Sequence, residues 1–302
     1  MLTGLHAEIA AASERLADAG VASPRHDAEA LAAHVLGVSR SRLPLADGFG
    51  ADQRRRFTHL VDERTDRVPL QHLTGLAGFR RLDLTVGPGV FVPRPETEVL
   101  VGWALHAITG QPAPLVVDLC AGSGAVALAI ANELPGVRVH AVERDPHALA
   151  WAERNVAARA AAGDSPVVLH PGDVADPALL SDLAGAVDLV TANPPYVPDA
   201  ATVEREVAEH DPPLALWGGP DGLDVIRQVE RAAARLLRAG GVVAVEHADL
   251  QGASVPALFA ACEQWTDVAD HRDLAGRPRF TTARRAVLTN RGSVHRRARD
   301  RV

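Results

Sequence analysis

PLVVDLCAGSG, the stretch from residue 114 to residue 124, is an apolar run that ends in a glycine-rich turn. Residues 115–119 have the length and composition of one buried strand, and residues 126–134 after the turn have those of a helix. Gly122 and Gly124 allow the backbone to turn tightly and to approach a ligand where a Cβ atom would clash. The stretch therefore predicts a strand–turn–helix unit of an α/β sheet, with a ligand site at the carboxyl end of the strand.

The alternation of strands and helices continues after this unit. We expect a helix over residues 147–161 and further strands over residues 137–142, 167–169, 187–190, 242–245 and 286–288. Short β-branched runs between helices are typical of a mostly parallel sheet that helices cover on both faces. Residues 93–288 are therefore predicted to form an α/β domain.

Upstream of the sheet, the sequence has a helical period. Residues 2–16 carry apolar side chains at every third or fourth position. Ser23 and Pro24 are typical of an N-cap and the first residue of a second helix, and a third helix is expected over residues 51–64. Residues 1–75 are therefore predicted to form a helical bundle domain.

A β-hairpin is expected to join the two domains. Residues 79–86 alternate like a strand, residues 87–89 have the Gly-Pro-Gly composition of a turn, and residues 90–92 return as a second short strand. The predicted linker covers residues 76–92.

Composition and charge describe a folded protein that binds polyanions weakly. Of the 302 residues, 31 are basic, all of them arginine, and 38 are acidic, which gives a net charge of −7. Nucleic-acid affinity depends on phosphate neutralisation, which this charge disfavours. Residues 289–302 are expected to be a basic, disordered tail. Cys120 and Cys262 cannot form a disulfide framework, so we expect a reducing cytoplasm, with neither a membrane span nor a metal ion.

Acidic residues follow the next two predicted strands. Glu143 comes about 20 positions after the glycine turn, where its carboxylate can accept both hydroxyls of a ribose. Asp173 and Val174 follow the third strand, where a carboxylate or a backbone amide can reach an adenine edge. No third glycine completes a dinucleotide motif, so one nucleoside fits better than two. Each feature alone is equally a solvated strand end or a turn, but together they line one edge of one sheet.

The fourth strand of the predicted sheet ends in Asn193-Pro194-Pro195-Tyr196. The prolines fix φ and lack amide donors, which leaves backbone carbonyls as free acceptors, and Asn193 adds a side-chain carbonyl. Tyr196 is the only tyrosine of the sequence, and its ring can stack on a flat amide or base. The segment predicts a rigid acceptor set for a planar NH₂ group, the alternative being a proline-rich loop with a packing tyrosine.

A nucleoside-binding sheet followed by Asn-Pro-Pro-Tyr resembles the class I S-adenosylmethionine (SAM) methyltransferases that act on planar nitrogens. Four further segments narrow the resemblance to the PrmC/HemK family, the bacterial peptide-chain release-factor glutamine N5-methyltransferases. They are RVPLQHLTG (67–75), FVPRPETE (91–98), LALWGGPDGLD (214–224) and DLAGR (273–277), and the likeness covers roughly residues 20–288. Three positions depart from the family pattern: Cys120 stands where many members have glycine, Val174 where an aromatic residue is common, and Glu143 where aspartate is commoner.

The resemblance implies a class I SAM methyltransferase fold, SAM as the cofactor and a release factor as the protein partner. The methyl acceptor would be the side-chain amide nitrogen of glutamine in a Gly-Gly-Gln motif, and the helical domain would select the substrate. No aspartate or glutamate is assigned as a base, and Cys120 is not expected to act as a nucleophile. The implied cofactor residues are Asp118, Cys120, Ala121, Gly122, Ser123, Gly124, Glu143, Asp173, Val174 and Asn193; the implied acceptor residues are Asn193, Pro194, Pro195 and Tyr196, of which Asn193, Pro194 and Tyr196 are catalytic.

Two other functions stay open at this point. One is a nucleic-acid amino-methyltransferase that acts on adenine N6 or guanine N2 of a flipped base, which the acidic net charge disfavours. The other is a SAM-binding module that docks a partner without catalysis, which the intact Asn-Pro-Pro-Tyr segment disfavours.

Overall fold

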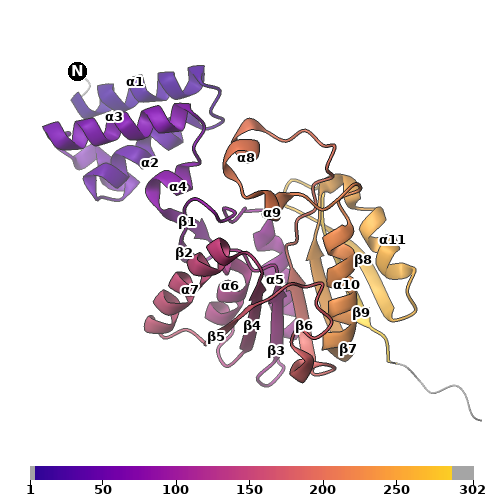
Figure 1. The fold of residues 1–302 in the computed structure, drawn as a ribbon. Helices are drawn as coiled ribbons and strands as arrows, with labels where there is room; N and C mark the ends of the chain where they lie inside the picture. Colours follow the sequence, from indigo (N-terminus) through magenta and orange to yellow (C-terminus); the bar gives the residue numbers. More distant parts are fainter. Residues whose placement is uncertain (1–3, 288–302) are drawn as a thin grey trace, which may run out of the picture.

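Three amphipathic helices open the chain in the computed structural model, which describes residues 4–287. The helical elements are α1 (Gly4–Asp18), α2 (Pro24–Leu36), η1 (Arg40–Leu45), α3 (Ala51–Thr65) and the short α4 (Leu70–Thr74). Their apolar faces, which include Leu16, Leu31 and Phe57, form a hydrophobic cluster of their own. Helix α2 begins at Pro24 as expected, although the Ser23 side chain makes no capping hydrogen bond. The helical part lies beside the upper end of the sheet (Figure 1).

The expected hairpin exists, but it is shifted toward the N-terminus. Strands β1 (Leu76–Phe79) and β2 (Leu82–Thr85) pair antiparallel, with the turn at Arg80 and Arg81. The predicted strand over residues 79–86 contains β2 but also the hairpin turn, and the predicted strand over residues 90–92 is wrong. A turn does form at residues 87–89, with the Val90 amide donating to the Gly87 carbonyl, but it follows the hairpin.

Arg80 explains this difference. Its backbone has a left-handed φ of 52°, and its N–H donates to Glu98 Oε1 over 2.9 Å. Its guanidinium forms an ion pair with Glu133. These contacts with the helices of the sheet hold the turn in place, whereas the sequence pattern showed only the alternation of the residues around it.

Within the described residues, the main sheet has seven strands in the order β5-β4-β3-β6-β7-β9-β8. They are β3 (Leu115–Leu119), β4 (Arg138–Glu143), β5 (Val167–Pro171), β6 (Val187–Ala192), β7 (Leu237–Glu246), β8 (Trp265–Arg272) and β9 (Pro278–Arg285). The first five strands of this order are parallel, as predicted, and β9 and β8 are antiparallel. The chain reverses its direction of travel across the sheet between β3 and β6, and ligands of open α/β sheets bind at such a point.

Helices cover both faces of this sheet (Figure 1). Helices α5 (Thr97–Ile108), α6 (Ala125–Glu133) and α7 (Pro146–Ala161) pack on one face, and α10 (Asp224–Leu236) and α11 (Ser254–Ala260) on the other. Successive residues of β3 alternate between the two cores: Val116 belongs to the first and Val117 to the second. The remaining short elements are η2 (Ser181–Leu183), α8 (Arg205–His210), α9 (Pro213–Leu216) and η3 (Asp249–Gln251).

The C-terminal strands differ from the expectation. The predicted strand over residues 286–288 is wrong, because β9 ends at Arg285 and neither Ala286 nor Val287 belongs to a strand. Leu288 and the expected tail over residues 289–302 lie outside the described residues. The sequence also did not indicate β8, since its residues after the buried Trp265 are exposed or half-buried at the edge of the sheet and form no apolar run.

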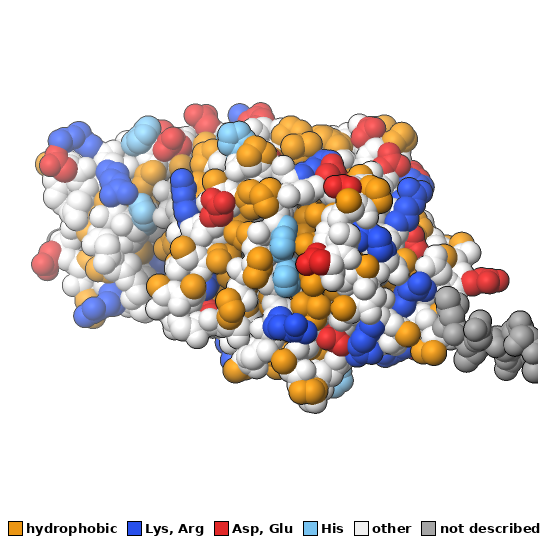
Figure 2. Space-filling view, turned by 60° about the horizontal axis from the view of Figure 1, so that its bottom comes forward, with side chains coloured by type: hydrophobic (Ala, Val, Ile, Leu, Met, Phe, Trp, Pro, Cys, Tyr) orange, Lys and Arg blue, Asp and Glu red, His pale blue; other side chains and the backbone are white. Residues whose placement is uncertain are grey.

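Arginine and acidic side chains lie next to one another over much of the face shown in Figure 2. Many arginines of the described residues are in ion pairs, for example Arg227 with Asp221 and Arg284 with Asp267. Paired charges cancel at a distance, so the arginines give no broad positive surface there. Across residues 4–287, none of the helices combines the length and the apolar character that a membrane span requires.

Candidate active site

A cavity of about 980 Å³ opens at the carboxyl ends of the parallel strands, where β3 and β6 lie side by side. The glycine turn, the end of β4 and the Asn-Pro-Pro-Tyr segment line it. Residues of the helical part, such as His26, Arg67 and Gln71, and the segment over residues 202–216 continue the same wall. One cavity therefore connects the expected cofactor site with the N-terminal helices.

Most residues expected from the sequence border this cavity. The lining includes Asp118, Cys120, Ala121, Gly122, Ser123, Glu143, Val174, Asn193, Pro195 and Tyr196. Gly124, Asp173 and Pro194 do not line it. Gly124 is the N-cap of α6 with φ 83°, Asp173 faces Arg144 at 3.3 Å and the Ala175 amide, and Pro194 is buried in the loop.

The glycine turn leaves open space on the cavity side. Gly122 has φ 57°, and a Cβ atom built there would meet nothing within 4 Å. Cys120 also has a positive φ, of 59°, a conformation that costs a residue with a Cβ on the order of 1 kcal/mol. This conformation accounts physically for glycine being favoured at the position. Burial, with Glu143 and Asp118 nearby, raises the pKa of the Cys120 thiol, so the thiol stays protonated.

Glu143 ends β4 and holds the glycine turn. Its Oε2 accepts a hydrogen bond of 2.8 Å from the Gly122 amide. Its Oε1 accepts two more, also of 2.8 Å, from the amides of Arg144 and Asp145. A ribose bound here would share Oε2 with Gly122, which differs from the expected contact with a free carboxylate.

Asp118 is a buried carboxyl on β3 that borders the cavity. Its Oδ1 accepts a hydrogen bond of 2.8 Å from the Thr191 hydroxyl, while Oδ2 has no hydrogen-bond partner among the described residues. Burial raises the pKa of Asp118 to about 7 against the effect of that hydrogen bond. A buried oxygen without a partner is costly unless a ligand donates to it.

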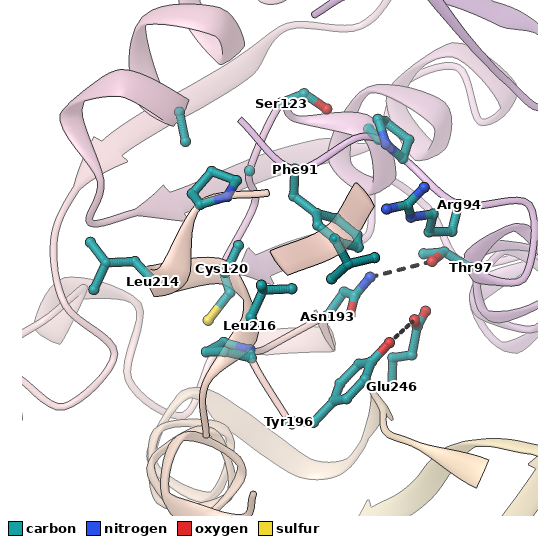
Figure 3. A pocket seen from close by; sticks show the side chains of 18 of the residues that line it. Phe91, Arg94, Thr97, Cys120, Ser123, Asn193, Tyr196, Leu214, Leu216 and Glu246 are labelled. Atoms are coloured by element: carbon teal, nitrogen blue, oxygen red, sulfur yellow. Dashed lines mark hydrogen bonds between the residues drawn. The ribbon is translucent and has the colours of Figure 1, made fainter. Parts of the chain in front are cut away.

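The acceptor loop is held rigidly at the edge of the sheet. The amide of Val197 donates to Leu216 over 2.8 Å, and the Tyr196 carbonyl accepts a hydrogen bond of 3.0 Å from Gln251. Asn193 Nδ2 donates to Thr97 Oγ1 over 3.3 Å. Its Oδ1 is therefore the atom left to accept a hydrogen bond from a ligand (Figure 3).

Sequence reasoning missed several residues behind this loop. Glu246 is 1% exposed, ends β7 and accepts a hydrogen bond of 3.4 Å from the Tyr196 hydroxyl. The signal that identified Glu143, an acidic residue at a strand end, was available for Glu246 too. Thr97 and Arg94 stood in the FVPRPETE segment without a role; Arg94 lies 4.9 Å from the Phe91 ring centroid and pairs with Asp211 at 2.8 Å.

Comparison with known proteins identifies relatives over nearly the whole chain. Residues 9–75 match the family model of the PrmC N-terminal domain, and residues 95–210 match the model of the methyltransferase small domain. A release factor glutamine methyltransferase of Streptomyces coelicolor is 54% identical over 287 residues, which cover 94% of this chain and 99% of the relative. A second, from Mycolicibacterium smegmatis, is 52% identical over 284 residues, with the same two shares.

A third relative is named for a different activity. A 4-amino-L-phenylalanine/4-methylamino-L-phenylalanine methyltransferase of Streptomyces pristinaespiralis is 42% identical over 263 residues, which cover 84% of this chain and 87% of the relative.

The parallel sheet, the cavity at its reversal point and the methyltransferase small domain define an enzyme with the class I SAM methyltransferase fold. With relatives this similar over this length, the chain belongs to the release factor glutamine methyltransferase family. Among residues 4–287 there is no cluster of three side chains that could hold a metal ion.

Proposed function

We propose that the protein transfers a methyl group from SAM to the side-chain amide nitrogen of the glutamine in the Gly-Gly-Gln motif of peptide-chain release factors. The observation that carries the proposal is Asn193, whose carboxamide gives its N–H to Thr97 and keeps its oxygen for an acceptor NH₂ group. The relatives from Streptomyces coelicolor and Mycolicibacterium smegmatis, both named release factor glutamine methyltransferases, support the same substrate.

The residues around the glycine turn fit SAM. Gly122 leaves room for the nucleoside, and Glu143 Oε2 faces the turn as an acceptor for a ribose hydroxyl. Asp118 Oδ2 is a buried acceptor without a partner, which suits a charged amino group. Val174 offers an apolar side chain for the base. When bound, SAM supplies a methyl group on a positively charged sulfur.

The acceptor residues would solve the main difficulty of the reaction, because an amide nitrogen is a poor nucleophile. Asn193 Oδ1 would accept one N–H bond and orient the nitrogen, and the Pro194 carbonyl, which does not line the cavity in this structure, would accept the other when the acceptor is bound. In the transfer, the nitrogen lone pair would form the N–C bond to the methyl group that SAM supplies, the S–C bond would break with its electrons passing to sulfur, and the nitrogen would lose a proton to water. Such alignment is worth roughly 7–11 kcal/mol.

We further propose a division of labour along the chain. Residues 1–75 would hold the release factor, and residues 76–92 would link the two domains. Residues 93–288 would bind SAM and transfer its methyl group. The helical part has its own core and contributes His26, Arg67 and Gln71 to the cavity wall, which suits contact with a protein that reaches into the site. A release factor acts at the ribosome, so we place the reaction in the cytoplasm.

The test is incubation with labelled SAM and a purified release factor, followed by peptide mass spectrometry. We expect label on the Gly-Gly-Gln peptide and none when the motif is changed to Gly-Gly-Glu, because a carboxylate offers no nitrogen. Asn193→Ala should lower the single-turnover rate by about 10²-fold or more with little change in SAM affinity. A wild-type rate in this variant would contradict the role of Asn193.

A second acceptor has support from one relative. The relative from Streptomyces pristinaespiralis is named for an aromatic amine, which is also a planar NH₂ group. Adding 4-amino-L-phenylalanine to the same assay separates the two acceptors. We expect transfer to the release factor and no competition by the amino acid.

A further inference from the structure

Glu246 is the buried group that the proposed chemistry leaves unexplained. It lies at the carboxyl end of β7, behind Asn193 and Tyr196, and it borders the cavity although its exposed fraction is 1%. A carboxyl group in such a place is costly unless its hydrogen bonds are satisfied. Its contacts therefore indicate what it does.

One donor from the acceptor side of the cavity reaches Glu246, and a second hydroxyl lies near it. The Tyr196 hydroxyl donates to Oε1 over 3.4 Å, as Figure 3 shows. The Thr97 hydroxyl lies close enough to lower the pKa of the carboxyl, whose Oε2 has no hydrogen-bond partner among the described residues. Thr97 Oγ1 accepts the Asn193 N–H at 3.3 Å. We call these three neighbouring side chains, from Asn193 through Thr97 to Glu246, the relay.

The relay has a direction because a hydroxyl has one hydrogen. If the Thr97 hydrogen points to Glu246, the oxygen of Thr97 can only accept from Asn193. Asn193 must then turn its NH₂ to Thr97 and its oxygen to the cavity. A reversed carboxamide would point two N–H donors at the cavity and would repel the NH₂ group of an acceptor.

We propose that Glu246 is a positioning residue that, through Thr97, fixes the Asn193 carboxamide with its oxygen toward the acceptor, and that holds the Tyr196 ring in place. This inference rests on the proposed function only in that the acceptor presents an NH₂ group. It makes Thr97 and Glu246 determinants of amide specificity that do not touch the substrate themselves.

The surroundings make the relay sensitive to pH. Burial, with a smaller effect of Glu96 before α5, raises the pKa of Glu246 to about 7. The nearby Thr97 hydroxyl, the charge of Arg279 on β9 and the hydrogen bond from Tyr196 lower the pKa. Burial lowers the pKa of His247, the next residue on the chain, whereas Asp270 of β8 acts to raise it. An ionised Glu246 can only accept, whereas a protonated one also donates and competes with the Thr97 hydrogen.

Four variants test the relay in the full-length protein: Glu246→Gln, Thr97→Val, Thr97→Ser and Thr281→Val. Thr97→Ser keeps the hydroxyl. Thr281→Val is the matched control, because Thr281 is fully buried on β9 and its hydroxyl has no partner among the described residues. For each variant we would measure the melting temperature, SAM affinity by calorimetry, and kcat and KM with a release factor from pH 5.5 to 9, a range of about two units around the Glu246 pKa.

We expect Glu246→Gln and Thr97→Val to lose about 10²-fold in kcat, with SAM affinity unchanged and a much smaller change in KM. Thr97→Ser should recover most of the rate, and Thr281→Val should match the wild type. The wild-type kcat should rise as the pH increases through about 7, and this rise should be absent in Glu246→Gln. A folded Glu246→Gln variant with the wild-type kcat and the same rise with pH would overturn the inference.

Failure of the proposed function would look different. The wild type itself would then leave the release factor unlabelled, and the same variants would be compared on 4-amino-L-phenylalanine, whose NH₂ group meets the same Asn193 oxygen. Equal rates of the wild type and Glu246→Gln on an acceptor that the wild type methylates would overturn the relay, and a rate lost in Glu246→Gln and recovered in Thr97→Ser would support it.

Discussion

At the scale of single residues, Gly122 and Gly136 share a backbone conformation but not their surroundings. Both have a positive φ, 57° and 82°, and a Cβ atom on either would meet nothing within 4 Å. The open space at Gly122 is the cavity, whereas Gly136 is an exposed turn residue between α6 and β4. A substitution at Gly136 therefore causes a similar backbone strain without affecting the cavity, whereas the same substitution at Gly122 does both.

Gly122→Val should abolish SAM binding, because the new side chain enters the space that we assign to the cofactor. Gly136→Val carries a similar backbone strain, of about 1–2 kcal/mol, and should bind SAM normally. Calorimetry of both variants, with circular dichroism to verify folding, measures the difference. Equal SAM affinities of Gly122→Val and the wild type would remove this turn from the cofactor site.

Glu246 should also shape the pH dependence of stability. Its pKa is 4.5 in the reference state and about 7 in the folded protein, so the folded state binds the proton more tightly. The contribution of this proton to the free energy of unfolding is complete below about pH 4.5 and is lost as the pH rises through about 7. Glu246→Gln should therefore gain roughly 3 kcal/mol over the wild type between pH 4.5 and 8.

Chemical denaturation of both proteins at pH 5 and pH 8, about two units below and one above the folded pKa, measures this difference. A gap in unfolding free energy that stays constant or narrows with rising pH would contradict the raised pKa. A more stable and less active variant at pH 8 would show that the buried carboxylate is kept at a cost to stability.

The sequence predicted a site residue only where that residue stands at the end of a predicted strand. Gly122, Glu143 and Asn193 each follow an apolar run, so parallel strands bring them to one edge. Thr97 precedes its partners by many residues and begins a helix, and its hydroxyl meets Asn193 only because α5 packs beside β6 and β7. No spacing within the sequence encodes that contact.

At the scale of elements, α8 connects the sheet domain with the helical part (Figure 1). Glu206 on α8 forms an ion pair of 2.8 Å with Arg64 and one of 3.4 Å with Arg67. The Arg64 side chain is 7% exposed and also pairs with Asp27 at 2.9 Å. The ion pairs of Glu206 with Arg64 and Arg67 fix the position of the segment over residues 202–216, which forms the outer wall of the cavity.

Glu206→Gln should weaken the hold between the two parts without reaching the cofactor. We expect KM for the intact release factor to rise about tenfold, a loss of about 1.4 kcal/mol, with SAM affinity unchanged. Glu209→Gln is the control, because Glu209 lies on the same helix and pairs with the exposed Arg205. Steady-state kinetics would contradict the connecting role if both variants had the wild-type KM.

Helices and strands were predicted best where the local pattern of apolar residues alone specifies them. The central parallel strands β3 and β6 are buried on both faces, and a predicted strand overlaps each of the five parallel strands, although β7 begins at Leu237, before the predicted residues 242–245. The hairpin turn and β8 depend on partners elsewhere in the chain, on Glu133 and Glu98 for the turn and on β9 for the edge strand. Local alternation carries no information about such partners.

At the scale of the whole molecule, the helical part has a core separate from the sheet yet borders the same cavity. Deleting residues 1–75 should keep measurable SAM binding and most activity on a short Gly-Gly-Gln peptide. Methylation of the intact release factor should fall far more, because the docking surface is lost. If the truncated enzyme methylated the intact factor as fast as the full-length protein, substrate selection would reside in the sheet domain.

The central claim is that the acceptor is the glutamine side-chain nitrogen, held by Asn193. The most direct measurement is fragmentation mass spectrometry of the release factor after a single turnover with labelled SAM. We predict one labelled methyl group on the side-chain nitrogen of the Gly-Gly-Gln glutamine, absent with the Gly-Gly-Glu factor. Label on another residue, or on 4-amino-L-phenylalanine in place of the release factor, would contradict the account.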